Sequence, residues 1–117
     1  MAALSQLVDN LVVTTFELDG PRVLIGRHPE NDIQIDEISV SSRHAYIDVE
    51  SNAYLEGTID HFVTDNNSTN GTFVNDIRLT ERQRLNNNDI VRVGWNLFRF
   101  VDEDENALEK TAFILEE

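Results

Sequence analysis

The sequence of 117 residues contains no cysteine, which excludes disulfide frameworks, cysteine-ligated zinc sites and a thiol nucleophile. It has few basic residues, nine against 22 acidic ones, and a net charge of −13. Affinity for DNA, RNA and anionic lipid comes largely from Lys and Arg that neutralise phosphates. The composition therefore argues against nucleic acid and membrane surfaces as partners, although it leaves room for one small positive pocket.

The first ten residues lack a basic segment followed by a long apolar one, so we expect no signal peptide. No apolar run is long enough to span a membrane. Together with the absence of cysteine, which fits a reducing compartment, this predicts a cytoplasmic protein.

The length and a hydrophobic content of 40% predict one folded domain with a real core. Residues 102–117 differ in composition, with seven acidic residues against one lysine and hence a net charge of −6. We therefore divide the chain into a domain at residues 1–101 and an acidic C-terminal tail at residues 102–117.

Turn signals interrupt the domain at short intervals, and the runs between them are rich in Val, Ile, Thr, Tyr and Phe. This rhythm predicts an all-β fold, a β-sandwich. The predicted strands are Leu11–Leu18, Arg22–Gly26, Ile33–Ile35, Ala45–Val49, Ala53–Glu56, His61–Thr64, Thr72–Val74, Ile90–Val93 and Leu97–Val101.

Several familiar chemical sites can be set aside. His28, His44 and His61 are scattered, without the i, i+4 spacing of a helical zinc site, so each is expected to be a surface or structural histidine. The acidic run that starts at Asp102 fails as an EF-hand, since Ala107 and Phe113 stand where the loop needs Gly and Glu. We predict no metal and no cofactor.

Catalysis is also not expected. Ser41 and His44 would supply a nucleophile and a base, but they share one short segment and no oxyanion hole accompanies them. The sequence therefore predicts a protein that is not an enzyme.

Three loops carry the functional signal, namely Ile25–His28, Ser39–His44 and Asn67–Thr72. Each is unremarkable alone. Together they supply a guanidinium, several hydroxyls, backbone N–H groups and a side-chain amide. These are the groups needed to hold a phosphate dianion and the peptide chain beside it.

In this order and spacing, Gly26-Arg27, Ser41-x-x-His44 and Asn67-Ser68-Thr69-Asn70-Gly71-Thr72 resemble the motifs of the forkhead-associated (FHA) domain. The resemblance covers roughly Val23 to Phe100. It implies a β-sandwich of two twisted, mostly antiparallel sheets that recognises phosphothreonine peptides without catalysis, through loops at one end.

The resemblance also implies ligand-binding roles for five residues. Arg27 would pair with the phosphate, and the Ser41 hydroxyl would donate to a phosphate oxygen. Ser42 would offer its backbone N–H or contact the peptide, and Thr69 would also reach the phosphate unless it only caps its own loop. Asn70 would hydrogen-bond the peptide main chain.

Three more residues would support the site. Gly26 and Gly71 would permit the turns, and His44 would join the loops from behind. The sequence departs from the family pattern at Ser39, where some members carry a basic residue that selects an acidic side chain, and at Asp76, where Gly is common.

The first prediction of function is thus a phosphothreonine-peptide binding module that acts as an adaptor with a Ser/Thr kinase. The alternative is an FHA-like structural or oligomerisation domain whose phosphate pocket is unused. In the tail, Thr111 is followed by Ile114, an aliphatic residue three positions later. Phosphorylated Thr111 could be a ligand for its own domain, which would silence the module, or for a neighbouring copy, which would link copies into oligomers. The favoured alternative is that Phe113 and Ile114 pack the tail on the sandwich.

Overall fold

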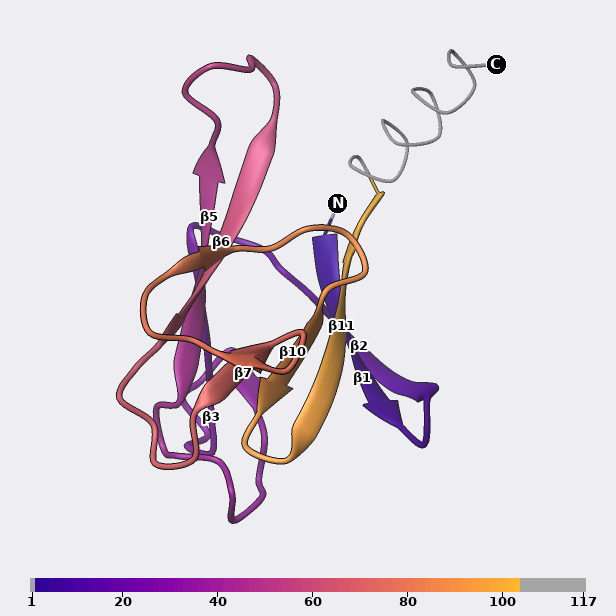
Figure 1. Ribbon diagram of the computed structural model, residues 1–117, viewed down its shortest axis with the longest axis vertical. Helices are drawn as coiled ribbons and strands as arrows, with labels where there is room; N and C mark the ends of the chain where they lie inside the picture. The colour runs from indigo at the N-terminus through magenta and orange to yellow at the C-terminus, as the bar shows by residue number, and fades with distance from the viewer. Residues whose placement is uncertain (1, 104–117) are drawn as a thin grey trace.

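The computed structural model describes residues 2–103, and these fold into two β-sheets that confirm the predicted all-β sandwich (Figure 1). One sheet has six strands in the order β2-β1-β11-β10-β7-β8, and the other has five in the order β4-β3-β5-β6-β9. The only parallel pair in the described part is β3 with β4, so both sheets are mostly antiparallel. The strands are β1 (Ala2–Val8), β2 (Leu11–Glu17), β3 (Arg22–Gly26), β4 (Ile33–Gln34), β5 (Ala45–Ser51), β6 (Ile59–Asp65), β7 (Thr72–Val74), β8 (Ile77–Arg78), β9 (Gln83–Arg84), β10 (Ile90–Val93) and β11 (Asn96–Asp102).

The core lies between the sheets and follows the alternation of the strands. Ile47 on β5 and Phe98 and Phe100 on β11 are completely buried, whereas Tyr46 and Arg99, their neighbours along the chain, are only partly covered. Successive side chains of a strand point to opposite faces, so one face of each sheet builds the core and the other meets solvent.

Three of the predicted strands have the observed bounds, β3, β7 and β10. The predicted strand Ala53–Glu56 is wrong, because this segment belongs to the connection between β5 and β6. There the Asn52 side chain accepts hydrogen bonds from the backbone N–H groups of Tyr54 (2.8 Å) and Leu55 (2.9 Å), and Gly57 has a φ of +80°. An Asx turn of this kind competes with strand pairing and bends the chain instead.

Three strands were not predicted: β1, β8 and β9. The first has no run of β-branched residues, yet it buries Leu4 and Leu7 between β2 and β11. The other two are only two residues long, too short for an alternating pattern to be visible. The turn Asn75-Asp76 joins β7 to β8 with φ of 50° and 69°, the left-handed geometry that a tight hairpin requires.

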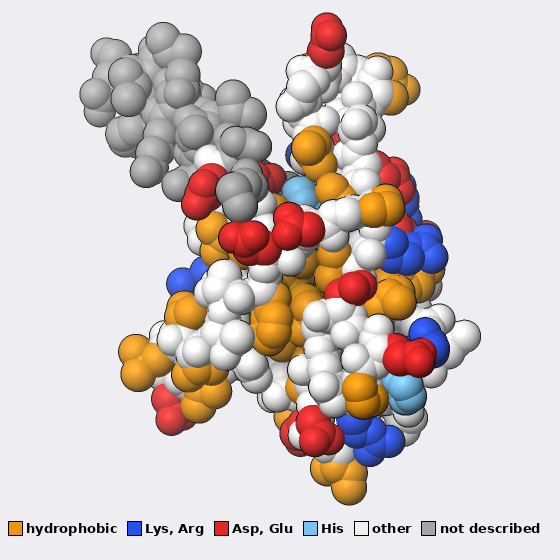
Figure 2. All heavy atoms as spheres, turned by 180° about the vertical axis from the view of Figure 1, so that it is seen from behind, with side chains coloured by type: hydrophobic (Ala, Val, Ile, Leu, Met, Phe, Trp, Pro, Cys, Tyr) orange, Lys and Arg blue, Asp and Glu red, His pale blue; other side chains and the backbone are white. Residues whose placement is uncertain are grey.

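The β1–β2 hairpin projects from the sandwich, and β2 forms one edge of the six-stranded sheet. Leu11, Val12 and Val13 are 70%, 53% and 55% exposed. Figure 2 shows the exposed hydrophobic side chains of this hairpin at its lower left. The register with β1 shifts between Gln6 and Leu7.

The last strand continues to Asp102, one residue into the predicted tail. The rest of the tail from residue 104, with Thr111, lies outside the described residues. Within residues 2–103 we find no helix of the length and apolar character that a membrane crossing requires.

Candidate functional site

The three loops singled out in the sequence meet at one end of the sandwich, the lower end in Figure 1. Since β3, β5 and β6 are successive antiparallel neighbours, the end of β3, the start of β5 and the end of β6 lie at the same end of the five-stranded sheet. In the other sheet the start of β7 lies beside the turn between β10 and β11. Hydrogen bonds between the loops connect these ends of the two sheets.

The loop after β3 is hydrogen-bonded along its backbone to the loop before β5. The N–H groups of Arg27 and His28 donate to the carbonyls of Ser41 (3.0 Å) and Ser42 (3.2 Å). The approach is so close that a Cβ at Gly26 would stand 2.3 Å from the Ser42 carbonyl oxygen. Glycine is therefore needed at position 26, because a side chain would not fit there. The close approach fixes the loop after β3 relative to Ser41.

The side-chain amide of Asn31 strengthens this junction and was missed in the sequence. Its Nδ2 donates to the carbonyls of His28 and Ser42, both at 2.8 Å. Asn31 is 8% exposed, so it replaces water as the partner of two loop carbonyls. A polar residue between two expected strands gives no signal of such a role.

His44 links the second loop to the third. Its Nδ1 accepts the N–H of Ser41 at 3.0 Å, which places the ring proton on Nε2, and Nε2 then donates to the Gly71 carbonyl at 2.8 Å. The ring is completely buried. Gly71 has a φ of +85°, a conformation that L side chains rarely adopt.

The third loop is organised by Asp65, the last residue of β6, which sequence reasoning also missed. Its carboxylate accepts the Ser68 N–H (3.2 Å), the Ser68 hydroxyl (2.5 Å) and the Thr72 hydroxyl (2.7 Å). The Ser68 hydroxyl in turn accepts the Gly71 N–H at 2.9 Å. The loop closes on its own side chains, and the Asx and Ser signals of its sequence were the available hint.

These supports leave the predicted ligand-binding groups at the surface. Ser41 Oγ accepts the Thr69 N–H at 3.1 Å, so its own hydroxyl proton remains to be donated. Asn70 Nδ2 donates to the Ser39 carbonyl at 2.8 Å. Arg27 is exposed, and its guanidinium makes no ion pair with any residue between 2 and 103.

Ser42 also has a structural role at the junction between the first two loops, and the two ligand-binding roles suggested for it stay predictions. Its carbonyl accepts hydrogen bonds from His28 and Asn31, so its main chain serves the junction between loops. Its side chain is exposed.

Ser39 is buried, 4% exposed, and joins the site to the turn between β10 and β11. Its hydroxyl accepts the Trp95 N–H at 3.0 Å, and both its hydroxyl and its N–H donate to the Glu37 carboxylate. These hydrogen bonds lower the pKa of Glu37. The turn approaches so closely that a Cβ at Gly94 would stand 2.4 Å from Ser39 Oγ.

The geometry also bears on catalysis and metals. Both ring nitrogens of His44 are taken by main-chain groups, so the ring is not placed to accept a proton from Ser41 Oγ. Among residues 2–103 no group of three His, Cys, Asp or Glu side chains is placed to hold a metal ion.

A cavity of about 240 Å³ lies away from these loops, lined by Leu18, Val49, Ile59 and His61 among others. Burial lowers the pKa of His61, against the opposing effect of nearby Asp102 and Asp60. The cavity shares no residue with the three loops, whose groups form an open polar surface.

Comparison with known proteins agrees with this geometry. The family model described as FHA domain matches residues 23–94. The chain is 45% identical over 60 residues to an oxoglutarate dehydrogenase inhibitor of Corynebacterium efficiens, which is 51% of this chain and 37% of that protein. It is 38% identical over 79 residues to the glycogen accumulation regulator GarA of Mycolicibacterium smegmatis, 68% of this chain and 45% of that protein. The aligned segments thus span less than half of these relatives.

Solved structures share the fold over most of the chain. The FHA domain of the CT664 protein from Chlamydia trachomatis has a TM-score of 0.73 and 27% identity, and the match covers 86% of this chain and 96% of that one. The yeast Dun1 FHA domain, solved with a doubly phosphorylated peptide, has a TM-score of 0.73 and 26% identity, with 86% and 72% covered.

Proposed function

The chain belongs to the FHA domain family, and from this premise we propose that it is a phosphothreonine-peptide binding module, an adaptor in Ser/Thr kinase-dependent signalling. The binding surface is the loop cluster that presents Arg27, Ser41, Thr69 and Asn70. Gly26, His44 and Gly71 hold these loops in place. The module acts by recognition and not by turnover.

The observation that carries the proposal is the hydrogen bonding of the Ser41 hydroxyl group. Its hydroxyl oxygen accepts the Thr69 N–H, and its hydroxyl proton is left for a ligand oxygen. Arg27 stands on the neighbouring loop, and its guanidinium makes no ion pair with the residues that the structure describes. A phosphate dianion has the charge and the acceptor oxygens to use both groups together.

Pre-formed supports favour tight binding by such a surface. His44, Asp65 and Asn31 already fix the three loops without a ligand. A ligand then loses little affinity to the ordering of the protein. Asn70 keeps its amide oxygen and one N–H beside the bond to Ser39, enough to pair with a peptide backbone.

The test is calorimetric titration of the full chain with an oriented phosphothreonine peptide library and its unphosphorylated and Glu-substituted counterparts. We expect binding of phosphothreonine peptides alone, because a carboxylate has one charge and two oxygens where the phosphate offers about −1.5 to −2 charges and three. Arg27→Ala should reduce the affinity about ten- to a hundredfold, the cost of a charge-assisted hydrogen bond.

A matched control is Arg22→Gln on the five-stranded sheet. It removes the same charge, and its partner Asp48 keeps Arg82 at 3.9 Å. We expect this variant to bind like the wild type. If Arg27→Ala also bound like the wild type, the phosphate site would not be at Arg27. If no phosphopeptide bound, the domain would instead be the structural alternative with an unused pocket.

A further inference from the structure

The arginines of this acidic chain fall into two groups. Four of them pair with carboxylates: Arg22 with Asp48, Arg43 with Glu30, Arg82 with Glu50, and Arg84 with Asp60. The other four make no ion pair within residues 2–103: Arg27, Arg78, Arg92 and Arg99. Arg27 belongs to the loop cluster, and the other three lie on one face of the molecule.

That face is the outer side of the six-stranded sheet. The registers place Arg92 directly opposite Phe73, and Phe73 directly opposite Arg78, so the three side chains form one row across β10, β7 and β8. Arg99 lies opposite Ile90 in the next row on the same side. We call Arg78, Arg92 and Arg99 the arginine face. Since neighbouring strands are spaced by about 4.8 Å, Arg78 and Arg92 stand roughly 10 Å apart.

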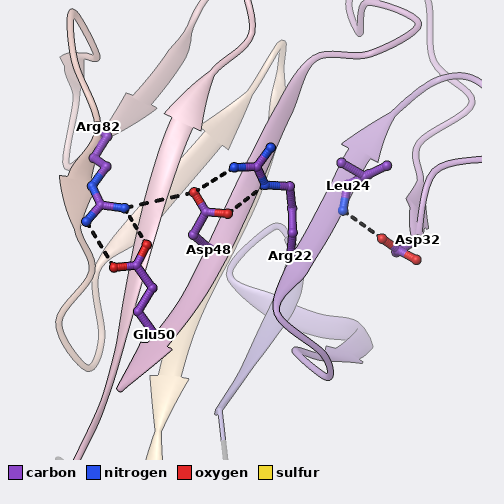
Figure 3. A network of polar contacts seen from close by, with 6 residues as sticks. All are labelled: Arg22, Leu24, Asp32, Asp48, Glu50 and Arg82. Atoms are coloured by element: carbon purple, nitrogen blue, oxygen red, sulfur yellow. Dashed lines mark hydrogen bonds and ion pairs between the residues drawn. The ribbon is translucent and has the colours of Figure 1, made fainter. Parts of the chain in front are cut away.

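No carboxylate balances these charges within the strands that carry them. Strands β7, β8 and β10 contain no Asp or Glu, and β11 has only Asp102 at its buried end. The outer face of the other sheet is the opposite case, as Figure 3 shows: Asp48 lies between Arg22 and Arg82, and Glu50 also pairs with Arg82.

The face adjoins the phosphothreonine loops. A Cβ at Gly71 would stand 3.0 Å from Arg78 Nε, so the Arg78 side chain lies against the third loop. The Arg92 guanidinium stacks 3.8 Å from the centre of the Phe73 ring and donates to the Gly94 carbonyl at 3.1 Å. Gly94 in turn packs against Ser39, the partner of Asn70. A ligand bound at the loops therefore has this face within its reach.

We propose that the arginine face binds an acidic segment that flanks the phosphothreonine of the same ligand. This rests on the proposed function. Arginine pairs well with carboxylates because of its planar fork, and the stacked Arg92 loses little freedom on binding. In a peptide of polyproline II conformation, carboxylates three residues apart lie on the same side about 9 Å apart, close to the spacing of Arg78 and Arg92.

The net charge of −13 does not oppose this locally. At physiological ionic strength, exposed charges further away than about 8 Å are largely screened. The acidic groups of the other sheet and of the hairpin thus weigh less on the ligand than the three guanidiniums beside it.

The experiment compares two phosphothreonine peptides by fluorescence anisotropy, one with neutral flanks and one with Asp at every third flanking position. The wild-type chain should bind the acidic peptide about three- to tenfold more tightly at low salt, as expected for two or three exposed ion pairs. The advantage should disappear in high salt. The double variant Arg78→Gln/Arg99→Gln should lose most of the advantage and keep its affinity for the neutral peptide, whereas Arg22→Gln should retain both.

The outcomes separate the two proposals. If the neutral peptide fails to bind, the phosphothreonine site itself is refuted. If it binds and acidic flanks add nothing, only the arginine face is refuted. If acidic flanks help only after Glu109, Glu116 and Glu117 are changed to Gln, the chain's own tail covers the face, and its assignment to the ligand is overturned. Arg78 and Arg99 make no side-chain hydrogen bond with other described residues, so their variants should fold.

Discussion

Replacement of His44 by Ala tests the architecture of the binding end most directly. The ring is completely buried and spans two loops through the Ser41 N–H and the Gly71 carbonyl. Alanine removes both hydrogen bonds at once, which leaves the buried Gly71 carbonyl and the partly buried Ser41 N–H without their side-chain partner. The variant changes no group that we expect to touch the ligand.

The expected loss of stability follows from those two orphaned groups. Each buried polar group without a partner costs roughly 1–3 kcal/mol, and the vacated ring volume adds to this. We expect the free energy of unfolding to fall by about 4 kcal/mol, against a total of roughly 5–15 kcal/mol for a domain. The midpoint of thermal unfolding should fall by about 15–25 °C.

Binding should suffer separately from stability. With His44 gone, Ser41 and Gly71 must be ordered by the ligand, at roughly 1–2 kcal/mol for each residue. The affinity for a phosphothreonine peptide should therefore fall about thirtyfold or more. Urea unfolding gives the first quantity, and calorimetry at 10 °C, where the variant is still folded, gives the second.

His61→Ala is the matched control, because His61 is also buried but packs against Phe100 with its rings 5.2 Å apart and lines the cavity away from the loops. It should lose stability and keep its peptide affinity within about twofold, as distant sites do. If His44→Ala, shown to be folded, bound the peptide as tightly as the His61→Ala variant, His44 would not be a positioning residue.

Three further predictions concern single positions. Gly26→Ala should cost roughly 2–4 kcal/mol in urea unfolding and weaken peptide binding, because the added Cβ forces the Ser42 carbonyl away and breaks several loop hydrogen bonds; a wild-type stability would contradict the close approach. Asp76→Gly should raise the stability by about 1 kcal/mol, since Asp76 pays for a left-handed φ of 69° that glycine adopts freely; an unchanged or lower denaturation midpoint would refute this. Burial lowers the pKa of His61 in the folded state, so the unfolded chain takes up the proton first as the pH falls below about 6.5, and the free energy of unfolding should decrease from pH 7.5 to 5.5. His61→Asn should flatten that decrease, and an equal slope in both proteins would refute the assignment.

The fold was predictable where local pattern and tertiary environment agree. The strands β3, β7 and β10 combine apolar alternation with clear turn signals at their ends, and their bounds were correct. The strand predicted at Ala53–Glu56 was wrong because the aliphatic and aromatic residues of this segment favour a strand, while Asn52 imposes a turn. The strand β1 was missed because its residues contain no run of β-branched residues, and its pairing with β11 at the other end of the chain leaves no local mark.

The site, like the fold, was predictable in its sequence motifs but not in its tertiary contacts. Arg27, Ser41, Thr69 and Asn70 were predicted from the order of three motifs, and the structure brings their loops together at one end. The supporting Asn31 and Asp65 were not predicted, because their value lies in carbonyls and hydroxyls that approach only in three dimensions. Which arginines pair with carboxylates also depends on contacts that form only in three dimensions. Charges are visible in a sequence, but their partners are not.

The exposed edge of β2 favours association between copies of the protein. Unpaired N–H and C=O groups on a long edge invite another chain, and sheets usually guard against this with Lys, Pro or an irregular register. Strand β2 contains neither Lys nor Pro and has only the register shift near Leu7. We therefore expect the excess of acid to keep copies apart, and this repulsion to vanish as the pH approaches the isoelectric point of about 4.4. Light scattering on lowering the pH from neutral should show association before the sandwich unfolds, and a lysine at Val13 should delay it.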